Sequence, residues 1–189
     1  MFHILHKLVL VVFYGLLAAL GALLYQKRSV LHPAVDYYQA WQISRENPGQ
    51  DRESVLGQVI KVTGEYAFQM RTAQGLLFNF QLTGFEPIAA TNRSDEAAAE
   101  FKEQCKSRFT ELILSNDVRV AATFLSPLRT GLGVAYRGET NVNAVLVEAG
   151  LARLNRNYLK GLARDELYDL LRAERKAREQ GLGLWNEQK

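Results

Sequence analysis

Cysteine and histidine are scarce in this chain of 189 residues. Its one cysteine, Cys105, excludes an internal disulfide framework. The three histidines, His3, His6 and His32, all stand near the amino end, so the chain has no Cys/His cluster that could bind zinc. A bound metal would therefore need carboxylate ligands, and the sequence implies no cofactor.

An excess of positive charge is also missing from most of the chain. The formal net charge of +3 comes from Lys7, Lys27 and Arg28, because no acid precedes Asp36 and the residues after Arg28 hold 20 basic and 20 acidic side chains. A domain that binds nucleic acid usually concentrates positive charge on its folded surface. We therefore disfavour nucleic acid as a partner, although a barrel that binds nucleic acid without catalysis stays an alternative.

An uncharged run of 18 residues extends from Leu8 to Tyr25, which is near the lower limit for crossing a hydrocarbon core of about 30 Å. With its neighbours, this run predicts a transmembrane helix over residues 4–26. A cleaved signal peptide is the alternative. The run is longer than the usual signal core of about 7–15 residues, and it ends in Gln26-Lys27-Arg28 instead of small residues, so we favour a retained single span.

Small residues recur within this run at spacings of three and four. Such a face lets another helix approach closely, whereas the same residues could also be apolar filler that faces lipid. We predict contacts with the membrane or with other membrane-protein subunits at Gly15, Ala18, Ala19 and Ala22.

A short juxtamembrane helix and linker are predicted over residues 33–50. Pro33 can open the helix, and Asn47-Pro48-Gly49 can end it. Aromatic side chains with polar tips suit the headgroup region of a membrane, and they would equally suit a partner protein. The predicted contact residues are Tyr37, Tyr38 and Trp41.

From Ser54 onward, apolar and polar residues alternate between turn signals. The pattern predicts strands over 56–62, 66–72, 76–82, 118–124 and 133–136, and helices over 95–115, 141–149 and 158–180. The Gly131-Leu132-Gly133 segment is expected to form the turn of a hairpin. Five strands with late helices favour an α+β domain over residues 54–186, built as an OB-type Greek-key barrel.

The last helix is expected to bury a leucine stripe: Leu162, Leu167, Leu170 and Leu171. Its charged residues are neighbours at i to i+3 and i+4, which is typical of a solvated face. They include Glu166, Asp169, Glu174 and Arg178. Cys105 stands on the apolar face of its own helix, so we expect it in the core.

Several motifs in the second half of the domain carry a resemblance. In order, they are Val142-Asn143, Leu-Val-Glu-Ala-Gly-Leu-Ala at 146–152, Ala-Glu-Arg-Lys-Ala-Arg at 173–178, and Gly-Leu-Trp at 183–185. Their order and spacing resemble the staphylococcal nuclease (thermonuclease-like) family. The resemblance extends over about Leu56 to Trp185 and implies an OB-type barrel with helices, in which Trp185 packs the last helix against the barrel.

The resemblance also implies a chemistry that this sequence does not support. The family hydrolyses phosphodiesters with a carboxylate-bound calcium, a glutamate that handles the attacking water, and two arginines that neutralise developing charge. In the segment that resembles the first arginine motif, Gln81 replaces the arginine and Glu86 stands for the metal aspartate. The water-handling glutamate falls on Ile88 or Ala89, and the first metal motif is reduced to Glu65.

The second arginine of the family falls on Leu132, because the family's Tyr-Gly-Arg-x-Leu-Ala-Tyr resembles Thr130 to Tyr136. Losing one preorganised charge costs roughly 10²–10³ in rate. We therefore predict a degenerate site with no catalytic residue at Gln81, Ala89 or Leu132. A slip in register could instead bring Arg129 or Arg137 to the site. Glu65 and Glu86 are then weak metal candidates, and plain surface carboxylates are the favoured interpretation.

These patterns lead to a pseudoenzyme hypothesis: a membrane-anchored, non-catalytic accessory or structural subunit of a membrane protein complex. Membrane-anchored thermonuclease-like proteins occur at the mitochondrial inner membrane, so the resemblance implies a respiratory, ATP-synthase or membrane-organising role there. No Arg/Ser-rich presequence precedes the apolar run to support that compartment. The alternative is a membrane-anchored calcium-dependent nuclease or phosphodiesterase.

Overall fold

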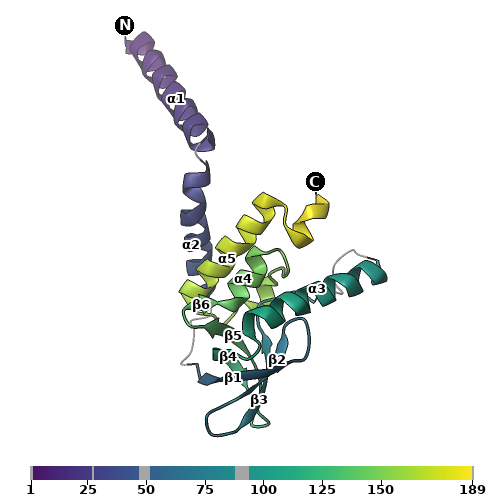
Figure 1. Ribbon diagram of the computed structural model, residues 1–189. Helices are drawn as coiled ribbons and strands as arrows, with labels where there is room; N and C mark the ends of the chain where they lie inside the picture. The colour runs from purple at the N-terminus through teal and green to yellow at the C-terminus, as the bar shows by residue number, and fades with distance from the viewer. Residues whose placement is uncertain (1, 27, 47–51, 88–93, 189) are drawn as a thin grey trace. The chain divides into compact units, whose positions relative to one another are not determined.

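The computed structural model describes residues 2–26, 28–46, 52–87 and 94–188 (Figure 1). The chain divides into two compact units, Met1–Tyr38 and Gln39–Lys189. The first unit contains helix α1, Phe2–Gln26, and the beginning of helix α2, Arg28–Glu46. The second contains the rest of α2 and a barrel with its covering helices.

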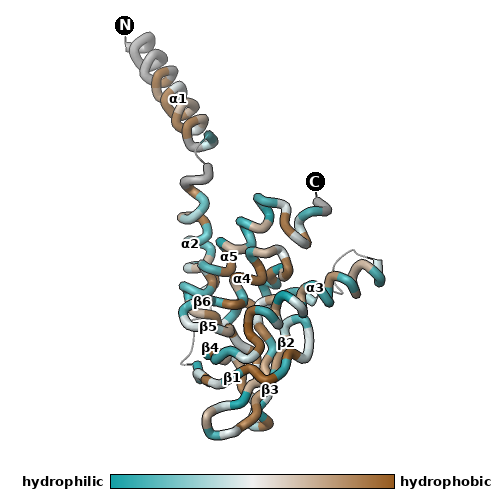
Figure 2. The backbone as a smooth tube through the Cα atoms, in the orientation of Figure 1, coloured by the Kyte–Doolittle hydropathy of each residue, from teal (hydrophilic) through white to brown (hydrophobic). Residues whose placement is uncertain are grey.

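Helix α1 covers the whole predicted span of residues 4–26 in helical conformation. The small residues Gly15, Ala18, Ala19 and Ala22 are all exposed on it, and Figure 2 shows the hydrophobic character of its described part. Among the residues that the structure describes, none of the helices combines the length and the apolar character needed to cross a membrane.

Helix α2 begins earlier than predicted. Pro33 was expected to open it, but the helix starts at Arg28 and Pro33 lies inside. The proline lacks the N–H that would bond to the carbonyl four residues back, so it removes one helix hydrogen bond, and the turns on either side continue. The predicted end at residues 47–49 and the rest of the linker to residue 50 lie outside the described residues.

The aromatic residues of α2 differ in exposure. Tyr37 and Tyr38 are exposed, whereas Trp41 is half-buried. The guanidinium of Arg45 lies 5.3 Å from the centre of the Trp41 ring, which is within the range of a cation–π contact. Tyr37 and Tyr38 are therefore accessible, and their contact with a membrane or a partner stays a prediction.

Five strands close into a barrel (Figure 1). In spatial order the barrel runs β3-β2-β1-β4-β5; every neighbouring pair is antiparallel, and a parallel β3–β5 pairing closes the circle. The short strand β6, Thr140–Asn141, adds to the edge of β5. The α+β, OB-type five-stranded barrel predicted from the sequence is confirmed. Its strands are β1 Ser54–Val62, β2 Ala67–Arg71, β3 Leu77–Leu82, β4 Asp117–Leu125 and β5 Thr130–Arg137.

Three α-helices accompany the barrel: α3 Asp95–Ile113, α4 Val142–Glu148 and α5 Arg164–Gln180. The last of these is shorter than predicted. Tyr158 was expected to begin it, but Tyr158 ends a separate 3-10 turn, η2 Arg156–Tyr158. Between the two, Gly161 has a left-handed φ of +81°, which interrupts a right-handed helix. The predicted stop at Gly181 is confirmed, with φ of +64°.

The core lies inside the barrel and under α3 and α5. Cys105 is fully buried, as the periodicity of its helix predicts, and its sulfur lies 3.2 Å from the carbonyl oxygen of Leu151. The hydroxyl of Tyr66 donates to the same oxygen at 2.6 Å. The predicted leucine stripe is buried in full: Leu162, Leu167, Leu170 and Leu171.

Two of the signature motifs meet in space. The backbone of Gly150 packs directly on that of Gly183, and the N–H of Leu184 donates to the Gly150 carbonyl at 2.9 Å. A Cβ on either glycine would overlap the other backbone, and both glycines have positive φ. Trp185, in the 3-10 helix η3, Gly183–Gln188, is buried, and the guanidinium groups of Arg153 and Arg178 lie 4.6 and 4.2 Å from the centre of its ring.

Candidate functional site

Residues 131–133 do not form the predicted hairpin turn. The turn is Ser126 to Arg129, where the Arg129 N–H donates to the Ser126 carbonyl at 2.9 Å. Gly131 and Gly133 are instead buried inside strand β5. A Cβ on Gly131 would stand 2.6 Å from Cε1 of Phe80, so the glycines permit neighbouring groups to approach closely where the barrel closes.

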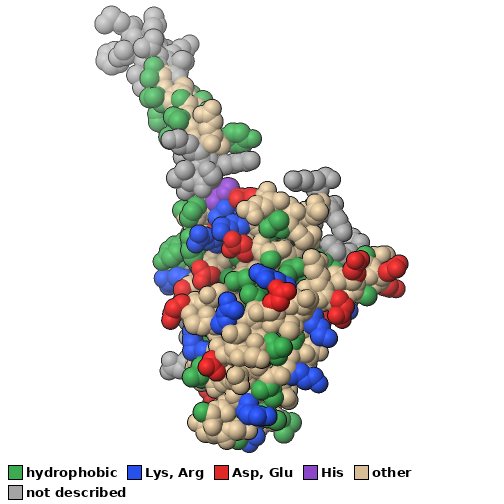
Figure 3. Space-filling model, viewed as in Figure 1, with side chains coloured by type: hydrophobic (Ala, Val, Ile, Leu, Met, Phe, Trp, Pro, Cys, Tyr) green, Lys and Arg blue, Asp and Glu red, His purple; other side chains and the backbone are tan. Residues whose placement is uncertain are grey.

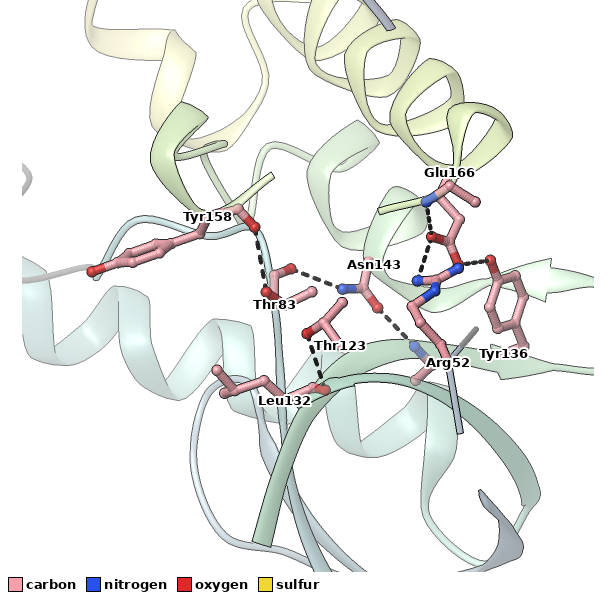
Figure 4. Close-up of polar contacts among 10 residues, drawn as sticks. Arg52, Thr83, Thr123, Leu132, Tyr136, Asn143, Tyr158 and Glu166 are labelled. Atoms are coloured by element: carbon pink, nitrogen blue, oxygen red, sulfur yellow. Dashed lines mark hydrogen bonds and ion pairs between the residues drawn. The ribbon is translucent and has the colours of Figure 1, made fainter. Parts of the chain in front are cut away.

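The positions of both missing arginines are adjacent. Gln81 and Leu132 are partners in the parallel register of β3 and β5, and both side chains are exposed. A bulge interrupts the neighbouring β4–β5 pairing between Ala122 and Phe124. There, the hydroxyl of Thr123 donates to the Leu132 carbonyl at 3.2 Å (Figure 4). The closure of the barrel therefore brings together two positions that lie far apart in the sequence.

A cleft of about 440 Å³ lies beside this pair. It brings together four of the five positions that the resemblance marks: Gln81, Leu132, Glu65 and Glu86. The fifth, Ala89, lies outside the described residues. The other described residues of the lining come from the β1–β2 connection, the end of β3 and the η2 turn; they include Tyr66, Phe85, Pro87 and Tyr158.

The charge of this cleft is negative. Its described lining contains Glu65 and Glu86 and no lysine or arginine. Glu86 lies 3.8 Å from a guanidinium nitrogen of Arg153, which itself stacks on Trp185. Within the described part of the chain, no group of three or more His, Cys, Asp or Glu residues could hold a metal ion. Arg153 offsets part of the charge of Glu86 from outside the described lining, but the cleft presents no cation of its own to a phosphodiester.

A second cleft, of about 340 Å³, adjoins the first and shares Ala67, Gln81 and Leu132 with it. Its described lining contains no charged residue. Among these residues Asn79 is held in place, because the side-chain amide of Gln69 donates to its oxygen at 3.1 Å. The second cleft therefore offers amide and apolar groups instead of charge.

A buried asparagine supports the rim of the first cleft. Asn143 donates from its amide nitrogen to the Thr83 carbonyl at 3.1 Å, and its oxygen accepts from the Ala135 N–H at 3.0 Å. The Thr83 hydroxyl donates to the Tyr158 carbonyl at 3.4 Å (Figure 4). Asn143 belongs to a motif that the sequence singled out, and its role is to join α4, β5 and the end of β3.

Glu166 is not on a solvated face, so that prediction was wrong. Its side chain is 3% exposed and lies at the beginning of α5. It accepts from the Tyr136 hydroxyl at 2.7 Å and from the Ala163 N–H at 2.9 Å, and it pairs with Arg52 at 2.7 Å (Figure 4). Burial, together with the hydrogen bond to Glu166, raises the pKa of Tyr136 well above its usual value.

Glu174 is a second correction of the same kind. It is 3% exposed, and it accepts from the Leu154 N–H at 3.0 Å. Arg156 and Arg178 contact its other oxygen at 3.1 and 3.2 Å. Two carboxylates of α5 therefore tie the helix to the barrel and to η2, since Arg52, Tyr136 and Arg156 come from other segments.

Similarity to known proteins identifies the family of this chain. The chain matches none of the curated proteins. The family model described as staphylococcal nuclease homologue matches residues 86–187, which is more than half of the chain. This match includes strands β4 and β5, helices α3 to α5, Leu132 and the Gly150–Gly183 contact. The chain therefore belongs to the staphylococcal nuclease homologue family.

Proposed function

We propose that this protein is a non-catalytic, membrane-anchored accessory or structural subunit of a membrane protein complex. The observation that carries the proposal is the pairing of Gln81 with Leu132 beside the first cleft. The resemblance to the family places its two arginines at these positions, and neither an amide nor an isobutyl group carries the charge that phosphate chemistry requires.

The rest of the cleft supports the same conclusion. Removing one preorganised donor costs roughly 10²–10³ in rate, so the replacement of both arginines leaves little transition-state stabilisation. The carboxylates that remain, Glu65 and Glu86, add negative charge where a phosphodiester would bind. A scaffold with intact packing and a site that has lost both arginines suits binding better than hydrolysis.

The membrane part of the proposal rests on the sequence. The uncharged run from Leu8 to Tyr25 lies within α1, and Lys27 and Arg28 follow it. Small residues on α1 and the aromatic residues of α2 supply faces for a partner helix or for lipid headgroups. The mitochondrial inner membrane, in a respiratory or ATP-synthase assembly or as a membrane organiser, is the placement that the resemblance favours.

Two measurements test this proposal on the full chain. After alkaline carbonate washing, the chain should stay in the membrane pellet, and its recovery in the supernatant would contradict the anchor. In mild detergent, it should migrate inside a large assembly on a native gel. A monomeric chain under these conditions would contradict the subunit role.

The alternative function is that of a calcium-dependent nuclease, and one observation favours it: Glu65 and Glu86 do line the same cleft. The arginines that could replace the missing pair are placed elsewhere. Arg129 lies in the β4–β5 turn, and the guanidinium of Arg137 donates to the Leu112 carbonyl at 3.0 Å. Calcium-stimulated cleavage of DNA or RNA that is lost on changing Glu65 or Glu86 would establish this alternative instead.

A further inference from the structure

Two hairpin turns lie at one end of the barrel (Figure 1). One joins β2 to β3 and the other joins β4 to β5. The parallel register pairs Asn79 with Thr130, and the Asn79 N–H donates to the Arg129 carbonyl at 2.9 Å. The beginnings of β3 and β5 are therefore side by side, so the turns that precede them share this end. We name residues 71–77 and 124–130 the barrel tip.

The barrel tip exposes large apolar side chains. Leu76 and Leu77 are exposed at the first turn, and Phe124 and Leu128 at the second. Leu128 is 84% exposed, more than any other large hydrophobic side chain that the structure describes. An exposed apolar cluster on a folded domain marks a surface that contacts something else.

Leu128 is held outward by the structure of its turn. The Leu128 N–H donates to the hydroxyl oxygen of Ser126 at 3.1 Å, and the Arg129 N–H donates to the Ser126 carbonyl at 2.9 Å. Pro127 follows Ser126, and its ring fixes φ at the value that the second residue of such a turn requires. Arg129 then adopts a left-handed φ of +58°, a conformation that favours glycine or asparagine over arginine. The leucine and the arginine are thus presented in a fixed geometry.

The charge of the barrel tip is positive. Arg71 and Arg129 are its only charged residues, and its sequence contains no aspartate or glutamate. Both arginines are exposed, and neither has an ion-pair partner among the residues that the structure describes. Figure 3 shows basic side chains next to hydrophobic ones at this end of the barrel.

We propose that the barrel tip docks on an anionic lipid surface. Leu76 and Leu128 stand in the turns themselves, where they can enter the boundary between headgroups and acyl chains, and Leu77 and Phe124 flank them on β3 and β4. The two arginines lie beside them, where they can contact lipid phosphates. A protein partner would be expected to use a flatter surface with charge depleted from its centre, and nucleic acid would require more cations. The inference goes beyond the proposed function, because it does not depend on the anchor.

The test uses the full chain held in neutral phosphatidylcholine nanodiscs and mixed with larger vesicles that contain phosphatidylserine. We expect the nanodiscs to sediment with these vesicles, not with phosphatidylcholine vesicles, and the binding to weaken as salt rises. The double variant Arg71→Gln/Arg129→Gln should bind about 30-fold more weakly, since each arginine near an anionic surface contributes about fivefold. Phe124→Ser/Leu128→Ser should bind at least about tenfold more weakly because less apolar surface enters the lipid.

Two control variants match these changes. Leu182 is an exposed leucine just after α5, and Arg108 is an exposed arginine on α3, so Leu182→Ser and Arg108→Gln should leave vesicle binding unchanged. The far-ultraviolet circular dichroism melting curve of each variant reports whether its barrel is folded. A tip variant that does not fold is replaced by the single change Leu128→Gln, which alters only a side chain in solvent.

Three outcomes would overturn the inference. The first is no preference for phosphatidylserine, and the second is equal binding by the wild type and the folded tip variants. The third is that nanodisc-held chains associate with one another, and that a change at Leu128 abolishes this association but not the binding to vesicles. That result would make the barrel tip a protein interface. If α1 proves not to anchor the chain in a membrane, the same vesicle measurement is made on the chain in solution. A wrong prediction about the anchor is thereby distinguished from a wrong prediction about lipid binding by the barrel tip.

Discussion

Gly131 lies against the aromatic ring of Phe80 where β3 and β5 close the barrel. The two residues are partners in the parallel register, and a Cβ on Gly131 would stand 2.6 Å from Cε1 of Phe80 and 2.8 Å from the Phe124 carbonyl oxygen. Gly133 is in a similar position against Ala121 and Val120. These contacts fix the path of β5, and β5 in turn places Leu132 beside Gln81.

Replacing either glycine with alanine should destabilise the barrel. Gly131→Ala and Gly133→Ala force backbone or ring atoms apart, which typically costs about 1–3 kcal/mol in the free energy of unfolding. Urea unfolding of the chain in mild detergent, followed by circular dichroism, measures the change. Gly64→Ala is the control, because its added Cβ would lie at an ordinary 3.5 Å from the Ala67 side chain. Equal stability of all three variants would contradict the close approach.

Restoring the two arginines should give the first cleft affinity for single-stranded nucleic acid. The wild type is expected to show no calcium-stimulated cleavage. Gln81→Arg/Leu132→Arg adds two cations beside one cleft, so the slope of log K against log salt should steepen by about 1.4. Fluorescence anisotropy with a labelled oligonucleotide measures that slope. Arginines at the exposed positions Leu56 and Gln74 serve as the control pair, and an equal effect from them would show that the cleft has no special role.

Glu166 is expected to matter far more than the exposed carboxylates of α5. Glu166→Ala leaves Arg52 and the Tyr136 hydroxyl without their buried acceptor, and breaking such a pair typically costs about 3–5 kcal/mol. Glu179 pairs with Arg175 at the surface, where ion pairs contribute about 0–1 kcal/mol, so Glu179→Ala is the matched control. Comparable unfolding free energies for both variants would contradict the buried network.

Stability should fall above about pH 10. Burial raises the pKa of Tyr66 and of Tyr136 above the ordinary tyrosine value of about 10. The unfolded chain therefore loses these protons first, so the folded state is fully favoured below about pH 10 and loses stability as the pH rises further. For the more deeply buried Tyr66, the loss approaches about 1.4 kcal/mol per pH unit. Urea midpoints at pH 8 and above 10 measure it, and Tyr66→Phe should flatten the dependence; an unchanged slope would contradict this origin.

The small-residue face of α1 should hold the chain in its assembly. Ala18→Leu/Ala22→Leu enlarges two side chains on one side of the helix and should release the subunit without unfolding the barrel, because close helix packing tolerates no added bulk. Native gels in mild detergent report the release, and circular dichroism reports the fold. Leu17→Phe adds bulk on the opposite side as a control. An intact assembly after the alanine changes would argue strongly against the structural role.

Local chemistry in the sequence determined most of the barrel and its helices. Alternation places the five strands within a few residues, and caps mark the helix ends: Ser94 accepts from the Ala97 N–H, and Gly181 adopts the left-handed conformation that ends α5. The four described positions Gln81, Leu132, Glu65 and Glu86 were also identified by resemblance alone, and the fold gathers them in one cleft. Strand alternation and helix caps depend on neighbours within a few residues.

Tertiary structure decided what depends on distant neighbours. A Gly-x-Gly segment has the same local preferences in a turn as in a strand, and the ring of Phe80 and the Phe124 carbonyl explain why Gly131 belongs inside β5. Glu166 and Glu174 have the spacing of surface residues, yet Arg52, Tyr136 and Arg156 approach them from other elements and make their burial favourable. The pairing of Gln81 with Leu132 has the same origin, because barrel closure sets the register between strands that no local pattern connects.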